Sequence, residues 1–142
     1  MSLNTDNLHR CIETLESSLQ FLDQHALDSI EYEIYRNAVV KGFELTLETA
    51  GKLLRKALKP YFATSKQADR LVFKDIFRTA SKHSILNVEE VSRWFSYRDN
   101  RNNTAHDYGI GFAEETLKLM PQFIFDAKHL RVQLDHEFTK AK

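Results

Sequence analysis

Residues 31–60 read EYEIYRNAVVKGFELTLETAGKLLRKALKP, and their pattern establishes the class of structure. Apolar residues recur in this segment at three- and four-residue steps, which places them along one side of a helix. Pro60 lacks the backbone N–H that a helix interior needs, so the helix should end before it. The segment therefore predicts one long, central helix with the apolar stripe Tyr32, Tyr35 or Arg36, Val39, Phe43, Leu47, Ala50, Leu54 and Ala57.

The same spacing appears on both sides of this segment. It predicts further helices over residues 8–26, from the end of a loop at 61–66 to residue 80, from 87 onward and over 113–134. The sequence holds only 4 Gly and 2 Pro, and no run of residues alternates in the way a half-buried strand does. We therefore expect an all-α protein with a single domain over residues 1–142, folded as an antiparallel four- to five-helix up-and-down bundle.

Helix boundaries and the core can also be predicted. Ser65 is placed to cap the third helix, and Asn87 followed by Glu90 has the form of an N-terminal capping box. Pro121 should kink the early part of the last helix. The single tryptophan and all 10 phenylalanines are expected in the core, because aromatic rings bury a large apolar area.

Composition narrows the class of protein. A hydrophobic fraction of 42% and a charged fraction of 28% are typical of a globular protein. No segment has the roughly 20 apolar residues that a transmembrane helix needs, and the first residues lack the order of a secretory signal. We expect a cytoplasmic protein without membrane contact. Cys11 is the single cysteine and the six histidines share no ligand spacing, so we expect neither a disulfide, nor a metal site, nor a cofactor.

Charge is distributed unevenly along the chain although the formal net charge is zero. Residues 1–50 contain three basic and nine acidic side chains, whereas residues 51–101 contain twelve basic and five acidic ones. Such asymmetry predicts an acidic side and a basic side of the bundle. The basic side is either an ordinary solvated surface or a surface that attracts phosphates.

One polar segment is hard to explain by folding alone. Residues 97–109 read YRDNRNNTAHDYG, and Asn and Asp weaken a helix interior because their side chains compete for backbone hydrogen bonds. In a continuous helix, Arg98, Asn102 and His106 share one side, and Arg101 and Tyr108 share another. If the helix instead ends at residue 102 or 103, a loop can fold His106 back toward the arginines. Either arrangement makes arginine and histidine neighbours.

These residue types suit phosphodiester chemistry. A guanidinium is a permanent cation with a fork of donors that matches phosphate, and an imidazole can transfer a proton near neutral pH. A neutral His106 can take the proton of a ribose 2′-hydroxyl while Arg101 stabilises charge that develops on the phosphate oxygens. Nearby guanidinium charge also favours the neutral form of His106. No metal ion is needed for this chemistry.

Residues 101–108, RNNTAHDY, resemble the Arg-x-x-x-x-His-x-Tyr signature of HEPN proteins. The similarity is closest to the nucleotidyltransferase substrate-binding subfamily, whose members are encoded beside a minimal nucleotidyltransferase. It extends to residues 77–80, to residues 89–94 and to the order of the helices. The resemblance therefore covers nearly the whole chain.

The resemblance implies a homodimer in which Arg101 and His106 of both protomers line one cleft. It implies a toxin with metal-independent RNase activity, neutralised by its nucleotidyltransferase partner, which attaches AMP to Tyr108. In these terms His106 is the general acid or base, Arg101 binds the phosphate and the transition state, and Asn102 orients the substrate. We add Arg98 as a further substrate-binding residue, because its charge lies one turn before Asn102.

Two other functions remain open at this point. The chain can instead be a non-catalytic subunit that holds a nucleotide or another substrate for a separate nucleotidyltransferase. It is not itself the transferase, because it lacks a Gly-Ser motif followed by paired aspartates. The third possibility is a helical dimer or adaptor whose polar segment is only a loop. In separate structural interpretations, Asn102 and Asn103 only end a helix and Tyr108 covers the end of the bundle.

Overall fold

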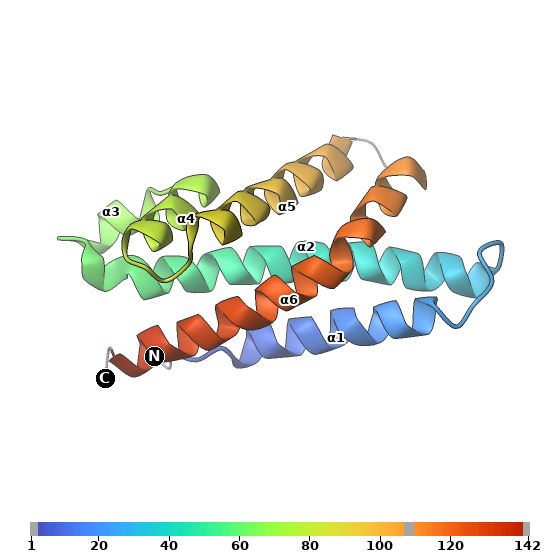
Figure 1. The fold of residues 1–142 in the computed structure, drawn as a ribbon, viewed down its shortest axis with the longest axis horizontal. Helices are drawn as coiled ribbons and strands as arrows, with labels where there is room; N and C mark the ends of the chain where they lie inside the picture. The colour runs from blue at the N-terminus through green and yellow to red at the C-terminus, as the bar shows by residue number, and fades with distance from the viewer. Residues whose placement is uncertain (1–2, 107–109, 141–142) are drawn as a thin grey trace.

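The computed structural model describes residues 3–106 and 110–140 of the chain, and these ranges contain helices and turns but no β-strand. The elements are α1 (Asp6–Leu22), α2 (Ile30–Leu58), the 3-10 helix η1 (Lys59–Tyr61), α3 (Ser65–Asp69), α4 (Phe73–Lys82), α5 (Val88–His106) and α6 (Ile110–Lys140). The four long helices α1, α2, α5 and α6 alternate in direction along the chain (Figure 1). The predicted all-α, up-and-down bundle is confirmed.

Helix α2 runs through the middle of the bundle, as its apolar stripe predicts (Figure 1). The stripe residues from Val39 to Leu54 are buried, and α1 and α6 both pack along α2. Helix α1 lies close to α2 at Gly42, where an added Cβ would lie 3.2 Å from Leu15 Cδ1. None of the helices in the described ranges is both long enough and apolar enough to cross a membrane.

The structure resolves which residue continues the α2 stripe between Tyr32 and Val39. Tyr35 is half-buried against α1, where its ring stacks on Phe21 and His25 at 5.4 Å and 5.3 Å between centroids. Arg36 is also half-buried, and its Nε is buried without a hydrogen-bond partner among the described residues. Both residues are therefore partly buried, and of the two Tyr35 makes the ring contacts.

The third helix was predicted as one element between a loop at residues 61–66 and residue 80, and this is wrong. The structure divides it into α3 and α4, with Val72 extended at φ −78° and ψ 165°. The cause is a contact that is distant in sequence: Nη2 of Arg55 donates to the carbonyl oxygen of Leu71 at 2.7 Å. Ser65 is the first residue of α3, and the N-cap position belongs to Thr64.

The turn between α4 and α5 is closely specified. Ser84 adopts the left-handed conformation at φ 61°, and the N–H of Ile85 donates to the carbonyl of Ala80 at 2.9 Å, which closes the end of α4. Helix α5 then begins with the predicted capping box, since the backbone N–H groups of Asn87 and Glu90 each donate to the other residue's side chain at 3.1 Å and 2.8 Å. These contacts fix where the helix with the polar segment starts.

The expectation that every phenylalanine is buried is wrong. Phe125 is 65% exposed and Phe21 is 47% exposed, while Phe95 is half-buried on the surface between α4 and α5. Phe125 follows buried Ile124 on α6 but lies off the core-facing side of that helix. Pro121 lies inside α6, whose first turns run at an angle to the remainder (Figure 1).

Candidate functional site

Helix α5 carries the polar segment predicted to be functional. Its backbone is helical from Val88 through His106, so the structure shows a continuous helix rather than one that ends at residue 102 or 103. The side chain of His106 and the whole of Tyr108 lie outside the described residues. The structure therefore places the backbone position of His106 at the end of α5.

The remaining predicted residues divide between two sides of α5. Arg101 lies one turn after the buried Tyr97, on the side that faces the core, and is half-buried. Arg98 and Asn102 lie one turn apart on a neighbouring side, where Arg98 is half-buried and Asn102 is exposed. The helix thus brings Arg98 and Asn102 onto one side and places Arg101 on another, with both arginines half-buried.

The guanidinium of Arg98 rests on an aromatic ring. Its Cζ lies 5.1 Å from the centroid of the Phe73 ring at the start of α4. Such a cation–π contact contributes about 0.5–1 kcal/mol at an exposed site. It orients Arg98 while leaving part of the side chain at the surface.

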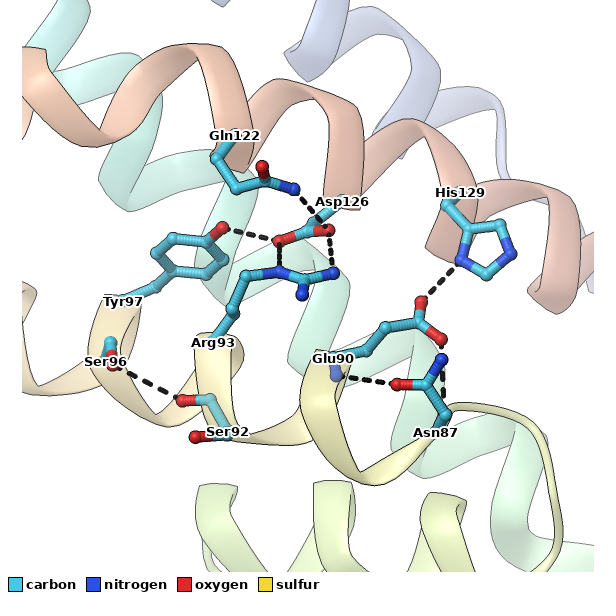
Figure 2. A network of polar contacts seen from close by, with 9 residues as sticks. All are labelled: Asn87, Glu90, Ser92, Arg93, Ser96, Tyr97, Gln122, Asp126 and His129. Atoms are coloured by element: carbon cyan, nitrogen blue, oxygen red, sulfur yellow. Dashed lines mark hydrogen bonds and ion pairs between the residues drawn. The ribbon is translucent and has the colours of Figure 1, made fainter.

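A buried carboxylate joins α5 to α6 immediately before this segment (Figure 2). The side chain of Asp126 is 1% exposed, and Arg93 donates to it through Nε at 2.8 Å and Nη2 at 2.9 Å. The hydroxyl of Tyr97 donates to the same carboxylate at 2.5 Å, and Nε2 of Gln122 donates at 3.2 Å. We call Arg93, Tyr97, Gln122 and Asp126 the Asp126 network.

The Asp126 network keeps its charges in fixed states. Burial alone would raise the pKa of Asp126, but the hydrogen bonds from Arg93, Tyr97 and Gln122 outweigh it, and the pKa of this carboxyl lies below its ordinary value. Burial is the largest cause that raises the pKa of Tyr97, and the hydrogen bond to Asp126 raises it further. The hydrogen bond to Asp126 also raises the pKa of Arg93. The network is therefore a permanent ion pair rather than a proton-transfer group.

Two further contacts tie α5 to α6 on either side of this network. Glu90 of the capping box also meets Nδ1 of His129 at 2.5 Å (Figure 2). Near the other end, Nδ2 of Asn100 donates to the hydroxyl of buried Thr116 at 2.9 Å. Glu90 and Asn100 thus tie α5 to α6 on either side of the Asp126 network.

Aromatic rings fill the space beneath the same part of α5. Trp94 is fully buried and packs against Phe77, Tyr97 and Phe123 at 5.0 Å, 5.5 Å and 5.6 Å between centroids. Phe123 also meets Phe43 of α2 at 4.8 Å. The polar segment therefore begins one turn beyond a rigid aromatic core.

Sequence reasoning missed the Asp126 network. One signal was present: Asp126 stands between the apolar positions Ile124 and Ala127, where a carboxylate needs a buried partner. Arg93 and Tyr97, four residues apart, offered a matching pair of donors on one side of α5. Recognising this pair required knowing that α6 lies against that side.

Histidines do not gather into a metal site in the part of the chain that the structure describes. Within these residues there is no group of three or more His, Cys, Asp or Glu side chains that could hold a metal ion. Cys11 lies 3.8 Å from the Thr49 hydroxyl in the contact between α1 and α2.

Comparison with known proteins bears directly on this segment. Residues 3–136 match the model of the family described as nucleotidyltransferase substrate binding protein like. A protein of Haemophilus influenzae named probable ribonuclease HepT is 26% identical over 136 residues, which cover 93% of this chain and 92% of that protein. These matches span both the core helices and the polar segment.

A solved structure shows the same arrangement of helices. It is a Haemophilus influenzae protein described as having the fold of a substrate binding domain of a nucleotidyltransferase. The TM-score is 0.79 at 24% identity, and the alignment covers 93% of this chain and 99% of the other. The likeness establishes that the two chains share a fold.

Proposed function

Because the chain belongs to the nucleotidyltransferase substrate binding protein family, as its resemblance to HEPN proteins predicts, we propose that it is a ribonuclease that needs no metal ion. Arg101 and His106 are its catalytic pair. One observation carries the proposal: the motif from Arg101 to Tyr108 occurs in a chain that is similar over nearly its full length to a probable ribonuclease.

The proposed reaction is an attack within the RNA strand. His106 takes the proton of a 2′-hydroxyl, the 2′-oxygen forms a bond to phosphorus, and the bond from phosphorus to the 5′-oxygen breaks. The leaving 5′-oxygen takes a proton from His106 of the second protomer. Arg101 stabilises the negative charge that grows on the phosphate oxygens. Asn102 and Arg98 hold the neighbouring part of the substrate.

A homodimer is part of this proposal, since one protomer supplies one copy of the pair. Two copies in a shared cleft provide a base for the 2′-hydroxyl and an acid for the leaving oxygen. The anchors that support this arrangement are described above: Asn100 on Thr116 and the Asp126 network hold the end of α5 against α6. They keep Arg101 in place before substrate arrives.

Regulation by a partner nucleotidyltransferase completes the proposal. The partner acts as the antitoxin: it transfers AMP from ATP to the oxygen of Tyr108, which loses its proton, and pyrophosphate leaves. A phosphate-bearing group two residues from His106 competes with RNA for the arginines, because it carries a negative charge of its own. Support comes from the family match and from the position of Tyr108 in the motif.

The ribonuclease proposal can be tested with purified protein, free of its partner. We expect it to cut RNA in the presence of EDTA, and His106→Ala to abolish the cutting. His136→Ala is the matched control, since His136 is an exposed histidine on α6. A wild-type protein that is folded, dimeric and inert at high concentration contradicts the proposal.

A second candidate function is a non-catalytic subunit that holds substrate for a separate nucleotidyltransferase. The description of the matching family and of the solved structure favours it. Co-expression with the neighbouring nucleotidyltransferase, followed by mass spectrometry, separates the two. AMP on Tyr108 supports the toxin, whereas a stable complex with unmodified, inactive protein supports the subunit. If no stable complex forms, the toxin and the subunit both lose support. If joint substitution of Arg101 and His106 changes neither activity nor binding, the adaptor function is favoured.

A further inference from the structure

Cations and an aromatic ring gather on one surface outside the motif. Helix α4 presents three cations at four-residue steps, which places them along one side of the helix. On α5, Phe95 and Arg98 lie beside them. We call this surface the α4–α5 basic face, and it consists of Lys74, Arg78, Lys82, Phe95 and Arg98.

The ring of Phe95 forms the floor between two of these cations. Nζ of Lys74 lies 5.3 Å from its centroid, and Cζ of Arg78 lies 5.1 Å from it. The ring is half-buried, so part of it remains open to a ligand. An aromatic ring flanked by cations is the combination that binds nucleic-acid bases by stacking and phosphates by charge.

A pocket of about 400 Å³ opens at this ring. Phe95, Val88 and Val91 provide apolar surface, while Arg78 and Lys82 contribute two cations. Pockets that hold small ligands have volumes of roughly 300–1,000 Å³. The pocket therefore has the size and the mixed lining suited to a flat, apolar ring attached to an anion.

Two carboxylates already contact the cations of this face. Asp75 pairs with Arg78 at 2.9 Å and Asp99 pairs with Lys74 at 3.0 Å. All four side chains are between 38% and 57% exposed, and ion pairs at such exposure contribute only about 0–1 kcal/mol. Phosphates can replace these partners at small cost, and the four cations outnumber the two paired carboxylates.

The face also leads toward the candidate catalytic residues. Val91, Phe95, Arg98 and Asn102 follow one another at three- and four-residue steps along one side of α5. From Phe95 to Asn102 the helix rises about 10 Å, at roughly 1.5 Å per residue. A strand that binds along this side reaches the end of α5 without crossing another element.

We propose that the α4–α5 basic face binds single-stranded RNA beside the bond that is cut. One base stacks in the pocket at Phe95, and Arg78, Lys74 and Arg98 bind the phosphates on the way to Asn102. This inference rests on the proposed ribonuclease function and adds the path of the substrate. A single strand fits better than a duplex, because stacking on Phe95 needs an unpaired base.

The test uses a fluorescent, 2′-O-methylated oligonucleotide of about 12 nucleotides, within the site sizes of single-strand binders. It binds but cannot be cut, since the attacking hydroxyl is blocked. Arg78→Ala should lower the affinity and reduce the slope of log affinity against log salt by about 1. Phe95→Leu, which keeps an apolar side chain but removes the ring, should weaken binding about tenfold.

Lys128→Ala is the matched control. Lys128 is an exposed cation on α6 that pairs with Glu16 at 2.8 Å, as Arg78 pairs with Asp75. Its removal should leave RNA affinity unchanged. Circular dichroism checks that each variant is folded, and Phe95→Leu and Arg78→Ala probe the face independently if one of them unfolds.

The outcomes separate this inference from the proposed function. If Arg78→Ala and Phe95→Leu both bind RNA with the affinity and salt slope of the wild type, the proposal for the α4–α5 basic face is wrong. This holds even if the enzyme cuts RNA. If RNA binding depends on both residues but the protein does not cut RNA, the α4–α5 basic face is supported. Only the proposed ribonuclease activity is then contradicted. If the variants instead lose only their complex with the nucleotidyltransferase, the face is the contact surface for that partner and the inference fails.

Discussion

Arg93 and Arg98 lie on the same helix, yet α5 holds the two guanidiniums in different ways. Arg93 makes two hydrogen bonds to a carboxylate that is 1% exposed, whereas Arg98 rests on the Phe73 ring at 5.1 Å. The first arrangement satisfies the charge within the protein. The second leaves donors available to a ligand. Side chains of one type can thus serve as an anchor on one side of a helix and stay partly exposed on another.

The largest expected loss of stability follows from replacing Arg93, the arginine that binds the buried carboxylate. Arg93→Ala removes two donors from Asp126 and leaves a buried carboxylate with fewer partners. We expect a loss of about 3–5 kcal/mol in the free energy of unfolding, because an uncompensated buried charge is costly. Urea denaturation followed by circular dichroism measures it. A loss below about 1 kcal/mol would show that water enters and replaces the guanidinium.

Lowering the pH should remove part of the stability that the ionised Asp126 side chain contributes. The folded-state pKa of Asp126 is lowered, so its stabilisation is fully present above the unfolded-state pKa of about 3.9 and is lost as the pH falls through the lower folded-state value. Asp126→Asn cannot titrate, and its unfolding free energy should fall less between neutral and acid pH than that of the wild type. All other carboxyl groups are common to both proteins. Equal acid sensitivity of the two proteins would contradict this assignment.

Arg98→Ala should have the smallest effect on stability. The substitution removes one cation–π contact on a half-buried side chain, which contributes about 0.5–1 kcal/mol. The same urea experiment measures it, with Arg93→Ala beside it. A loss as large as that of Arg93→Ala would mean that Arg98 is an anchor too, and the distinction between the two sides of α5 would then fail.

Much of the fold could be predicted because its signals are local. The apolar stripe of α2 and the capping box of Asn87 and Glu90 depend on residues within a few turns of one another. The break between α3 and α4 could not be predicted, since it depends on Arg55 reaching Leu71 from α2. Local spacing alone favours one helix there.

The candidate site divides in the same way. The motif from Arg101 to Tyr108 is contiguous, so the sequence alone shows it, and its roles remain predictions for the experiments above. The sequence alone did not show which residues of α6 hold the helix that carries this motif. Asp126 and Thr116 come from α6 and meet α5 only after the bundle has formed. The surface position of Phe95 was missed for a related reason, because apolar character by itself does not say which rings the neighbouring helix covers.

The position of these anchors late in the chain has a consequence for synthesis. A ribosome completes α5 before it makes Thr116 and Asp126, which lie 16 and 33 residues beyond the side chains that they bind. Until α6 emerges, the α1–α2 hairpin can form and α5 can pack on α4, but the contacts that tie α5 to α6 are missing. The end of α5 should therefore reach its folded position only after the residues of α6 up to Asp126 have left the ribosome.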